Sequence, residues 1–304
     1  LKEIKQKPEE FMNRFHAAQM SHALSALPSD NYVRRAAAIR ELVINPCLTR
    51  DHFENLVSAM REELSPRRFR GLYSIAAIYQ LGEAMLRLDT PAALPIFRDE
   101  ILAHGHHPLK TNGLLMFVAT SHAEADRRFI LECLDNEVET IRQSALQALI
   151  TLGGVSDAVL MQVLRRGHCG QIQQVTQAAT NGWLHLNPRQ VVGGLLAREA
   201  ISWEILSDIF YFLGLEALLP EEKAALFLRA LETTGEFVSP TDFGLRFEGV
   251  VSDPRFGLER LLEFLRRVKT LRQNQPFPAY WYDRFPVGVR QEVARHHQEF
   301  AQHV

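Results

Sequence analysis

The sequence predicts an all-α fold, specifically a right-handed α-α superhelix of stacked helix pairs. Apolar residues recur at helical spacing through nearly the whole chain, as in Phe53, Leu56, Val57 and Met60. Glycine, proline and polar turn residues interrupt this pattern every 12 to 20 residues, and strand-like alternation is scarce. The chain is 46% hydrophobic, which is enough to bury a core. These observations indicate short antiparallel helices joined by tight turns.

The helices form a repeat. Alternate helices are expected to begin at apolar residues spaced by 36, 40, 32, 31 and 31 positions, which are Val33, Phe69, Leu109, Ile141, Ile172 and Trp203. A turn or breaker usually follows 11 to 13 residues later, at Asn45, Gly82, Ser121, Gly153 and Gly214, while the fifth unit ends early at Gly182. A two-helix unit cannot hide both of its apolar faces alone, so neighbouring units are expected to stack into one continuous core.

Two positions inside the unit share a residue type. Four residues after each start, five of six residues are small, as expected where helix backbones approach closely: Ala37, Tyr73, Gly113, Ala145, Thr176 and Ser207. One residue after each start, the first four residues are basic and the last two are not: Arg34, Arg70, Lys110, Arg142, Gln173 and Glu204. The basic residues are expected to form a ladder along one ridge.

Two segments carry a family resemblance. Asp30-Asn31-Tyr32-Val33-Arg34-Arg35-Ala36-Ala37-Ala38, and the stretch from Asp135 to Leu149, resemble the second helix of a HEAT repeat. The resemblance implies an array of about six units over residues 1–215, with a cap at 1–26, and divergent helical repeats with a cap over 216–304. Pro188, Pro220 and Pro254 are expected at helix starts. Only Gly235 to Val251 is expected to hold a short irregular or β segment.

Charge and cysteine content limit the classes of function. Residues 1–153 carry 18 basic and 19 acidic residues and residues 154–304 carry 16 and 17, so a bulk basic surface for nucleic acid is not expected. Three cysteines without CxxC spacing predict reduced thiols and a cytoplasmic location: Cys47, Cys133 and Cys169. Cys133 lies in an apolar helix and is expected to be buried and inert. No apolar run has the length of a membrane span, although the start at Leu1 leaves an upstream anchor as an option.

A histidine cluster raises the question of a metal. His104, His106 and His107 could supply imidazole ligands, with Cys169 as a further donor if the fold brought it close. The alternative is that these histidines are ordinary polar residues of a turn, and we favour this interpretation. HEAT-like deoxyhypusine hydroxylases carry His-Glu dyads, and no His here is followed by Glu. We therefore expect no metal and no cofactor.

The ladder and an aromatic segment each have two interpretations. The basic ladder is either a stripe for an anionic partner or, as the HEAT resemblance implies, a structural ladder that bonds acidic residues of neighbouring units. The segment from Pro276 to Pro286 contains Tyr280 and Trp281, which could contact a partner. Alternatively, it folds back over the last helices and seals the core.

The sequence contains no phosphate-binding loop, dinucleotide fingerprint or Gly-x-Ser-x-Gly elbow. We therefore expect a non-enzymatic scaffold or adaptor that binds a protein, for example through an acidic segment, on the concave face of the helical stack. The expected contact residues are Arg35, Arg70, Tyr73, Lys110, Asn112, Gln143, Tyr280 and Trp281. Two alternatives are a HEAT-like alkylpurine DNA glycosylase, given Trp183, Trp203 and several arginines, and a factor resembling phycobilin lyases, whose units run nearer 30 residues.

Overall fold

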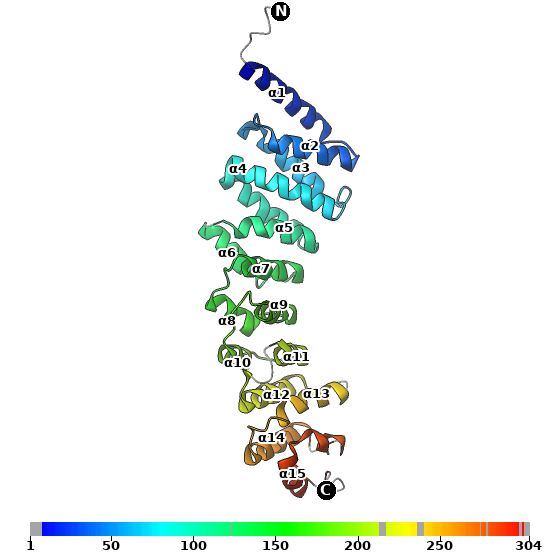
Figure 1. The fold of residues 1–304 in the computed structure, drawn as a ribbon, viewed down its shortest axis with the longest axis vertical. Coiled ribbons are helices and arrows are strands. Elements are labelled where there is room, and N and C mark those ends of the chain that lie inside the picture. The colour runs from blue at the N-terminus through cyan, green and yellow to red at the C-terminus, as the bar shows by residue number, and fades with distance from the viewer. Residues whose placement is uncertain are drawn as a thin grey trace, which may run out of the picture. The chain divides into compact units, whose positions relative to one another are not determined.

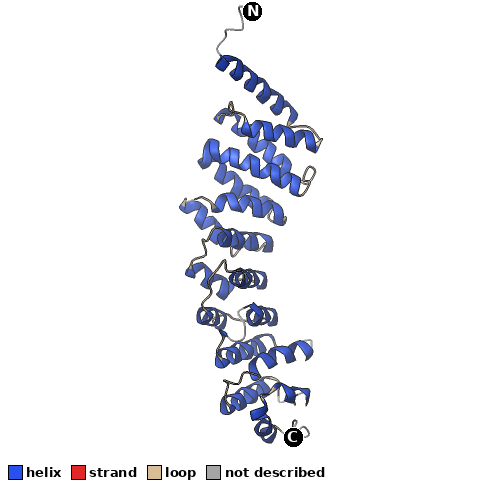
Figure 2. Ribbon diagram, in the orientation of Figure 1, coloured by secondary structure: helices blue, strands red, loops and turns tan. Residues whose placement is uncertain are grey.

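The computed structural model describes residues 8–121, 123–212, 217–235, 240–273, 275–277, 279–297 and 300. Regular structure in these ranges is entirely helical, with no strand (Figure 2). The predicted all-α class is therefore confirmed. The chain divides into two compact units, Leu1–Leu152 and Gly153–Val304.

The first unit contains seven α-helices within its described residues. They are α1 (Pro8–Ala26), α2 (Tyr32–Ile44), α3 (Phe53–Leu64), α4 (Leu72–Ala103), α5 (Pro108–Ala119), α6 (Glu124–Cys133) and α7 (Glu139–Thr151), with a short 3-10 turn, η2 (Arg50–His52), before α3. Helices α1, α2, α4, α5 and α7 pack in that order, each on the next, as Figure 1 shows. Helix α3 packs on α4, and α6 contacts both α5 and α7.

The second unit continues the pattern of paired helices. Its elements are α8 (Asp157–Arg166), α9 (Cys169–Thr180), α10 (Pro188–Leu196), α11 (Trp203–Phe212), α12 (Pro220–Thr234), α13 (Pro240–Val251), α14 (Leu258–Leu271), η4 (Ala279–Arg284), η5 (Val287–Val289) and α15 (Arg290–His296). Helices α8, α10, α12 and α14 pack successively, while α9 packs on α11 and α11 contacts α12. None of the described helices combines the length and the apolar character needed to cross a bilayer.

Local sequence signals explain where many of these helices begin. The side chains of Asn31, Ser156 and Asn187 accept hydrogen bonds from backbone amides in the first turns of α2, α8 and α10. Pro188 and Pro220 occupy the first helical positions of α10 and α12, where proline needs no amide hydrogen, as predicted. Pro254 instead lies in the turn before α14.

Helix α4 contradicts the predicted break at Gly82. The helix continues through Gly82, and the glycine there makes room for the Phe117 ring of α5, since a Cβ atom at this position would lie 2.4 Å from that ring. The chain bends later, at Asp89, whose φ of −158° and ψ of 81° are non-helical. The predicted start at Phe69 is also displaced, since α4 begins at Leu72 after Gly71, whose φ is 60°.

The expected β or irregular segment is also wrong where it can be compared. Residues Pro240–Val251 form α13, and the remainder of that stretch up to 239 is described only at Gly235. Helix α13 contributes Phe247, which is fully buried in the aromatic core at the end of this unit. The predicted breaker Gly214 lies outside the described residues.

The aromatic segment covers the last helices, as one of its two interpretations predicted. Phe277, Trp281 and Phe285 are buried, and the Trp281 ring stacks on Phe247 with centroids 4.1 Å apart. Phe247 also stacks on Phe264 of α14. Trp281 is only 1% exposed, so it does not offer a contact surface. The side chain of Tyr280, the other expected contact residue, lies outside the described residues.

Candidate partner-binding surface

The basic residues near the helix starts divide into two groups. Arg35, Lys110 and Arg142 are buried, whereas Arg34 and Arg70 are exposed. The predicted ladder of Arg34, Arg70, Lys110 and Arg142 therefore mixes both groups and does not form one exposed ridge. The buried side chains bond within the fold, and the exposed ones border a different surface.

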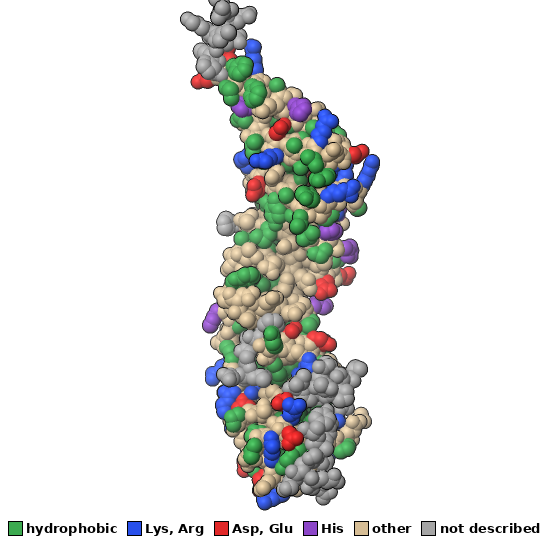
Figure 3. All heavy atoms as spheres, turned by 45° about the vertical axis from the view of Figure 1, so that its right-hand side comes forward, with side chains coloured by type: hydrophobic (Ala, Val, Ile, Leu, Met, Phe, Trp, Pro, Cys, Tyr) green, Lys and Arg blue, Asp and Glu red, His purple; other side chains and the backbone are tan. Residues whose placement is uncertain are grey.

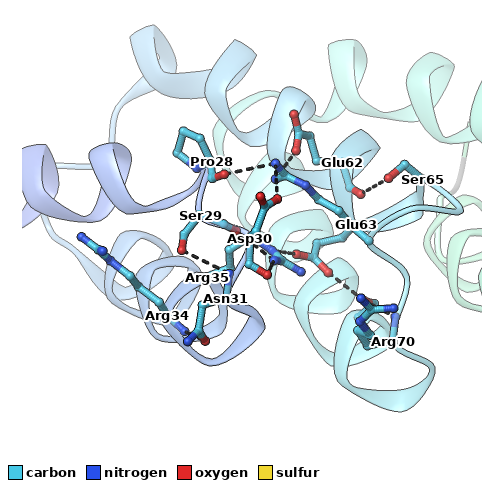
Figure 4. Close-up of polar contacts among 12 residues, drawn as sticks. Pro28, Ser29, Asp30, Asn31, Arg34, Arg35, Glu62, Glu63, Ser65 and Arg70 are labelled. Carbon is cyan, nitrogen blue, oxygen red and sulfur yellow. Dashed lines mark hydrogen bonds and ion pairs between the residues drawn. The ribbon is translucent and has the colours of Figure 1, made fainter.

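Arg35 belongs to a buried polar cluster between α2, α3 and α4. Its Nε donates to Glu63 Oε1 at 2.6 Å, and its Nη1 donates to the carbonyl oxygens of Ser29 and Asp30. The hydroxyl of Ser74 donates to the other Glu63 oxygen at 2.7 Å. Figure 4 shows Arg35 and Glu63 pointing toward each other while Arg34 points away. Arg35, expected to contact a partner, is instead satisfied inside the fold.

Arg142 repeats part of this arrangement. Its Nη1 donates to the carbonyl oxygens of Asn136 and Glu137, which lie six and five positions earlier, just as Ser29 and Asp30 precede Arg35. The structural equivalent of Arg142 is therefore Arg35 and not Arg34, and the predicted register of the first unit is off by one residue. The small residue predicted at Ala37 is displaced by the same one position, since Ala38 is buried and Ala37 is exposed.

Lys110 is the third buried base. Its Nζ donates to the carbonyl oxygen of Leu64 and lies 4.6 Å from the centroid of the Phe69 ring. Burial lowers the pKa of the Lys110 ammonium. The Phe69 ring also contacts the His107 ring, with centroids 4.5 Å apart. Lys110 thus ties the start of α5 to the end of α3, which leaves it unavailable to a partner.

A group of exposed apolar side chains lies at the first turns of α2 and α4. Tyr32, Val33, Leu72 and Tyr73 form this helix-start face, with exposed fractions from 43% for Tyr32 to 74% for Leu72. The Tyr32 and Tyr73 rings lie 5.4 Å apart, which joins the two helix ends into one surface. Figure 3 shows hydrophobic side chains gathered over the first unit, with Lys and Arg side chains beside them. Contiguous exposed apolar groups of this kind mark interaction sites.

The charges bordering the helix-start face are mainly positive. The guanidinium groups of Arg34 and Arg70 have no hydrogen-bond or ion-pair partner among the described residues. The nearby acidic side chains are engaged: Arg68 pairs with Asp30 at 3.5 Å and with Glu62, while Glu63 is buried with Arg35. The two free cations therefore remain available to negative charge on a bound molecule.

The other two expected contact residues lie on α5 and α7. Asn112 is half-buried, and its side-chain oxygen has no hydrogen-bond partner in the described structure. Gln143 donates to Glu139 Oε1 at 2.8 Å, one turn earlier on α7. Of the six expected contact residues in the first unit, all of them described, Arg70 and Tyr73 lie at the helix-start face.

The histidine cluster occupies the turn between α4 and α5. His104 Nε2 lies 3.4 Å from Glu100, and burial, reinforced by nearby Lys110, lowers the pKa of His104. His106 is exposed, and His107 packs on Phe69. Within the described residues, no three His, Cys, Asp or Glu side chains converge as metal ligands would. Cys169 has Asp208 as its neighbour, at 3.9 Å, in the second unit.

The DNA-binding alternative depended partly on Trp183 and Trp203. Trp183 is exposed, but Trp203 is buried and donates through Nε1 to the carbonyl oxygen of Gly235 at 3.1 Å. Stacking on a base requires an exposed ring face, which Trp203 does not offer.

No family model, curated protein or solved structure matches this chain. The HEAT resemblance therefore depends on the residues quoted above. Sequence reasoning missed Tyr32, Val33 and Leu72 as surface residues, since it identified Val33 only as an apolar helix start, and Val33 is 57% exposed. The signal was a pair of consecutive apolar residues in a first helical turn, where only one of the two can face the neighbouring helix.

Proposed function

We propose that this chain is a non-enzymatic protein-binding module built of HEAT-like helix pairs, and that it binds its partner on the helix-start face. The observation that carries the proposal is the contiguous exposure of Tyr32, Val33, Leu72 and Tyr73 beside two arginines whose guanidinium groups have no partner in the described part of the chain. Tyrosine combines a large apolar ring with a polar end, and it is enriched in the residues that dominate binding energy.

The chemistry of the face favours a segment with apolar side chains and at least one acidic residue. The apolar side chains would cover the Tyr32 and Tyr73 rings, and the acidic residue would pair with Arg34 or Arg70. A guanidinium can hold a carboxylate through two parallel hydrogen bonds, which fixes the orientation of the bound segment. Such binding is expected to weaken as ionic strength rises, because both cations are exposed to solvent.

Affinity capture from the native host tests the proposal. Wild-type chain and the double variant Leu72→Ser/Tyr73→Ala are used as baits, and captured proteins are quantified by mass spectrometry. We expect the partner to be enriched with the wild type and at least about tenfold depleted with the variant.

A matched control is available at the other end of α2. Ile44 is 72% exposed at the opposite end of α2, so Ile44→Ser removes a similar apolar surface without touching the helix-start face. Helix content and melting temperature of all three proteins are compared by circular dichroism. If every captured protein responds to Ile44→Ser as strongly as to the double variant, the helix-start face is not the binding site.

A further inference from the structure

A trough runs between α12 and α14 of the second unit. Two hollows, of about 350 and 440 Å³, share the lining residues Ala225, Leu228, Glu263 and Arg267 and therefore adjoin one another. Phe256 and Phe264 add to the floor of the first hollow. The trough exists because α12 presents alanines at 224 and 225, where larger side chains would fill the space above α14.

The rim of the trough is charged and largely self-neutralised. Glu221 pairs with Arg260, Glu263 with Arg266, and Glu232 with Arg229. Two charged side chains of the lining form no hydrogen bond or ion pair with the described residues: Arg267, which lines both hollows, and Glu259, which lines only the first. An occupant therefore needs an apolar side for the floor and a negative charge for Arg267.

Helix α1 of this same chain has the required properties. Its second half packs on α2 through Met20, Ala23 and Ala26, but its first half leaves Phe11 67% exposed and Phe15 47% exposed. These two rings are four residues apart and so lie on one face of the helix. Glu9 and Glu10 are exposed in the first turn of α1, immediately before this apolar face.

We propose that the first half of α1 from one copy docks in the α12–α14 trough of a second copy. Phe11 and Phe15 would lie on the floor of alanine, leucine and phenylalanine side chains, and Glu9 or Glu10 would pair with Arg267. The contact joins two different surfaces, so it leaves a free helix on one copy and a free trough on the other. The site is small, so the association is weak, reversible and dependent on concentration.

Sedimentation velocity over a protein concentration of about 1 µM to 1 mM tests the proposal. We expect the weight-average mass of the wild type to rise with concentration. Phe11→Ser/Phe15→Ser removes the inserted side chains, and Ala225→Gln fills the trough. Each change is expected to weaken association at least about tenfold. Tyr211→Ser, which alters an exposed aromatic residue of α11, is the matched control.

Charge reversal provides the decisive comparison. Arg267→Glu is expected to weaken association, and Glu9→Arg/Glu10→Arg mixed with Arg267→Glu is expected to restore it. A fluorescent peptide of residues 8–26 should bind the Phe11→Ser/Phe15→Ser chain and fail to bind the Ala225→Gln chain. The proposal is overturned if the wild type stays monomeric over the whole concentration range. It is also overturned if neither the α1 variants nor the trough variants change the association. Leu72→Ser/Tyr73→Ala should leave association intact, so the two proposed surfaces can fail independently.

Discussion

The Arg35 guanidinium and the Glu63 carboxylate lie 2.6 Å apart, and both side chains are almost completely buried. The Ser74 hydroxyl donates to the second Glu63 oxygen, and the carbonyl oxygens of Ser29 and Asp30 accept from Arg35 Nη1. If one partner of such a pair is removed, the fold is destabilised, because the remaining buried charge has lost the attraction that offset its desolvation.

The first prediction follows from that pair. Arg35→Met leaves the Glu63 carboxylate buried without its cation, and we expect the free energy of unfolding to fall by about 3–5 kcal/mol. The double variant Arg35→Met/Glu63→Met removes both charges and should regain a large part of the loss. Urea unfolding followed by circular dichroism measures both. Arg34→Met, at the exposed neighbour, serves as the control, and an equal loss there would contradict a specific role for Arg35.

The second prediction concerns the contact between α4 and α5. In Gly82→Ala the added methyl group would overlap Phe117, whose ring is held between Phe97 and Tyr79. We expect a loss of about 1–3 kcal/mol in the free energy of unfolding. Gly193→Ala in α10 is the matched control, because nothing lies within 4 Å of the added atom. Better helix propensity should make that control neutral or up to about 1 kcal/mol more stable. Stabilisation by Gly82→Ala would show that the ring can move aside.

The third prediction concerns thiol reactivity. Burial raises the pKa of Cys133 to about 12, so its reactive thiolate is scarce at pH 8 in the folded protein. We expect a disulfide reagent to leave Cys133 unmodified in the native chain while the half-buried Cys47 reacts. Mass spectrometry of the labelled peptides identifies the modified residues, and chain unfolded in guanidinium should yield three reacted thiols. Fast native labelling of Cys133 would contradict its burial.

The fourth prediction concerns pH. Burial lowers the pKa of His104 below its ordinary value of 6.5, so the unfolded chain takes up this proton before the folded chain does as pH falls. His104 therefore lowers the free energy of unfolding progressively below about pH 6.5. Melting temperatures from pH 8 to pH 5 should fall less steeply for His104→Gln than for wild type. If the melting temperatures of the two proteins depend on pH in the same way, protonation of His104 is not coupled to folding.

The helical class could be predicted because it depends on spacing along the chain, which the sequence states directly. The register of the individual units could not be predicted in the same way. Arg34 and Arg35 are adjacent and identical, and only the contacts with Glu63, Ser29 and Asp30 distinguish the buried residue from the exposed one. The predicted helix break at Gly82 was wrong for a related reason, because glycine occurs both where a helix ends and where two helices pack closely.

The binding surface was predicted only in part. Tyr73 and Arg70 lie at the helix-start face, but Lys110 and Trp281 have the same residue chemistry and are buried. Tryptophan and cationic side chains serve both partner contacts and internal contacts, so composition does not separate the two uses. That separation requires knowledge of which atoms the neighbouring helices cover.

The shared geometry of Arg35 and Arg142 constrains how this chain can change in length. Each guanidinium reaches back to carbonyl oxygens five and six positions earlier, so the intervening residues must keep their number. An insertion within 29–35 or 136–142 would pull the arginine away from those oxygens. The segment between α2 and α3 holds only shorter intervals, from Asn45 to Leu48 and from Thr49 to His52, so extra residues are expected to be tolerated best between Leu48 and Thr49. Evolutionary drift in loop size is therefore expected at helix exits and not at these two helix entrances.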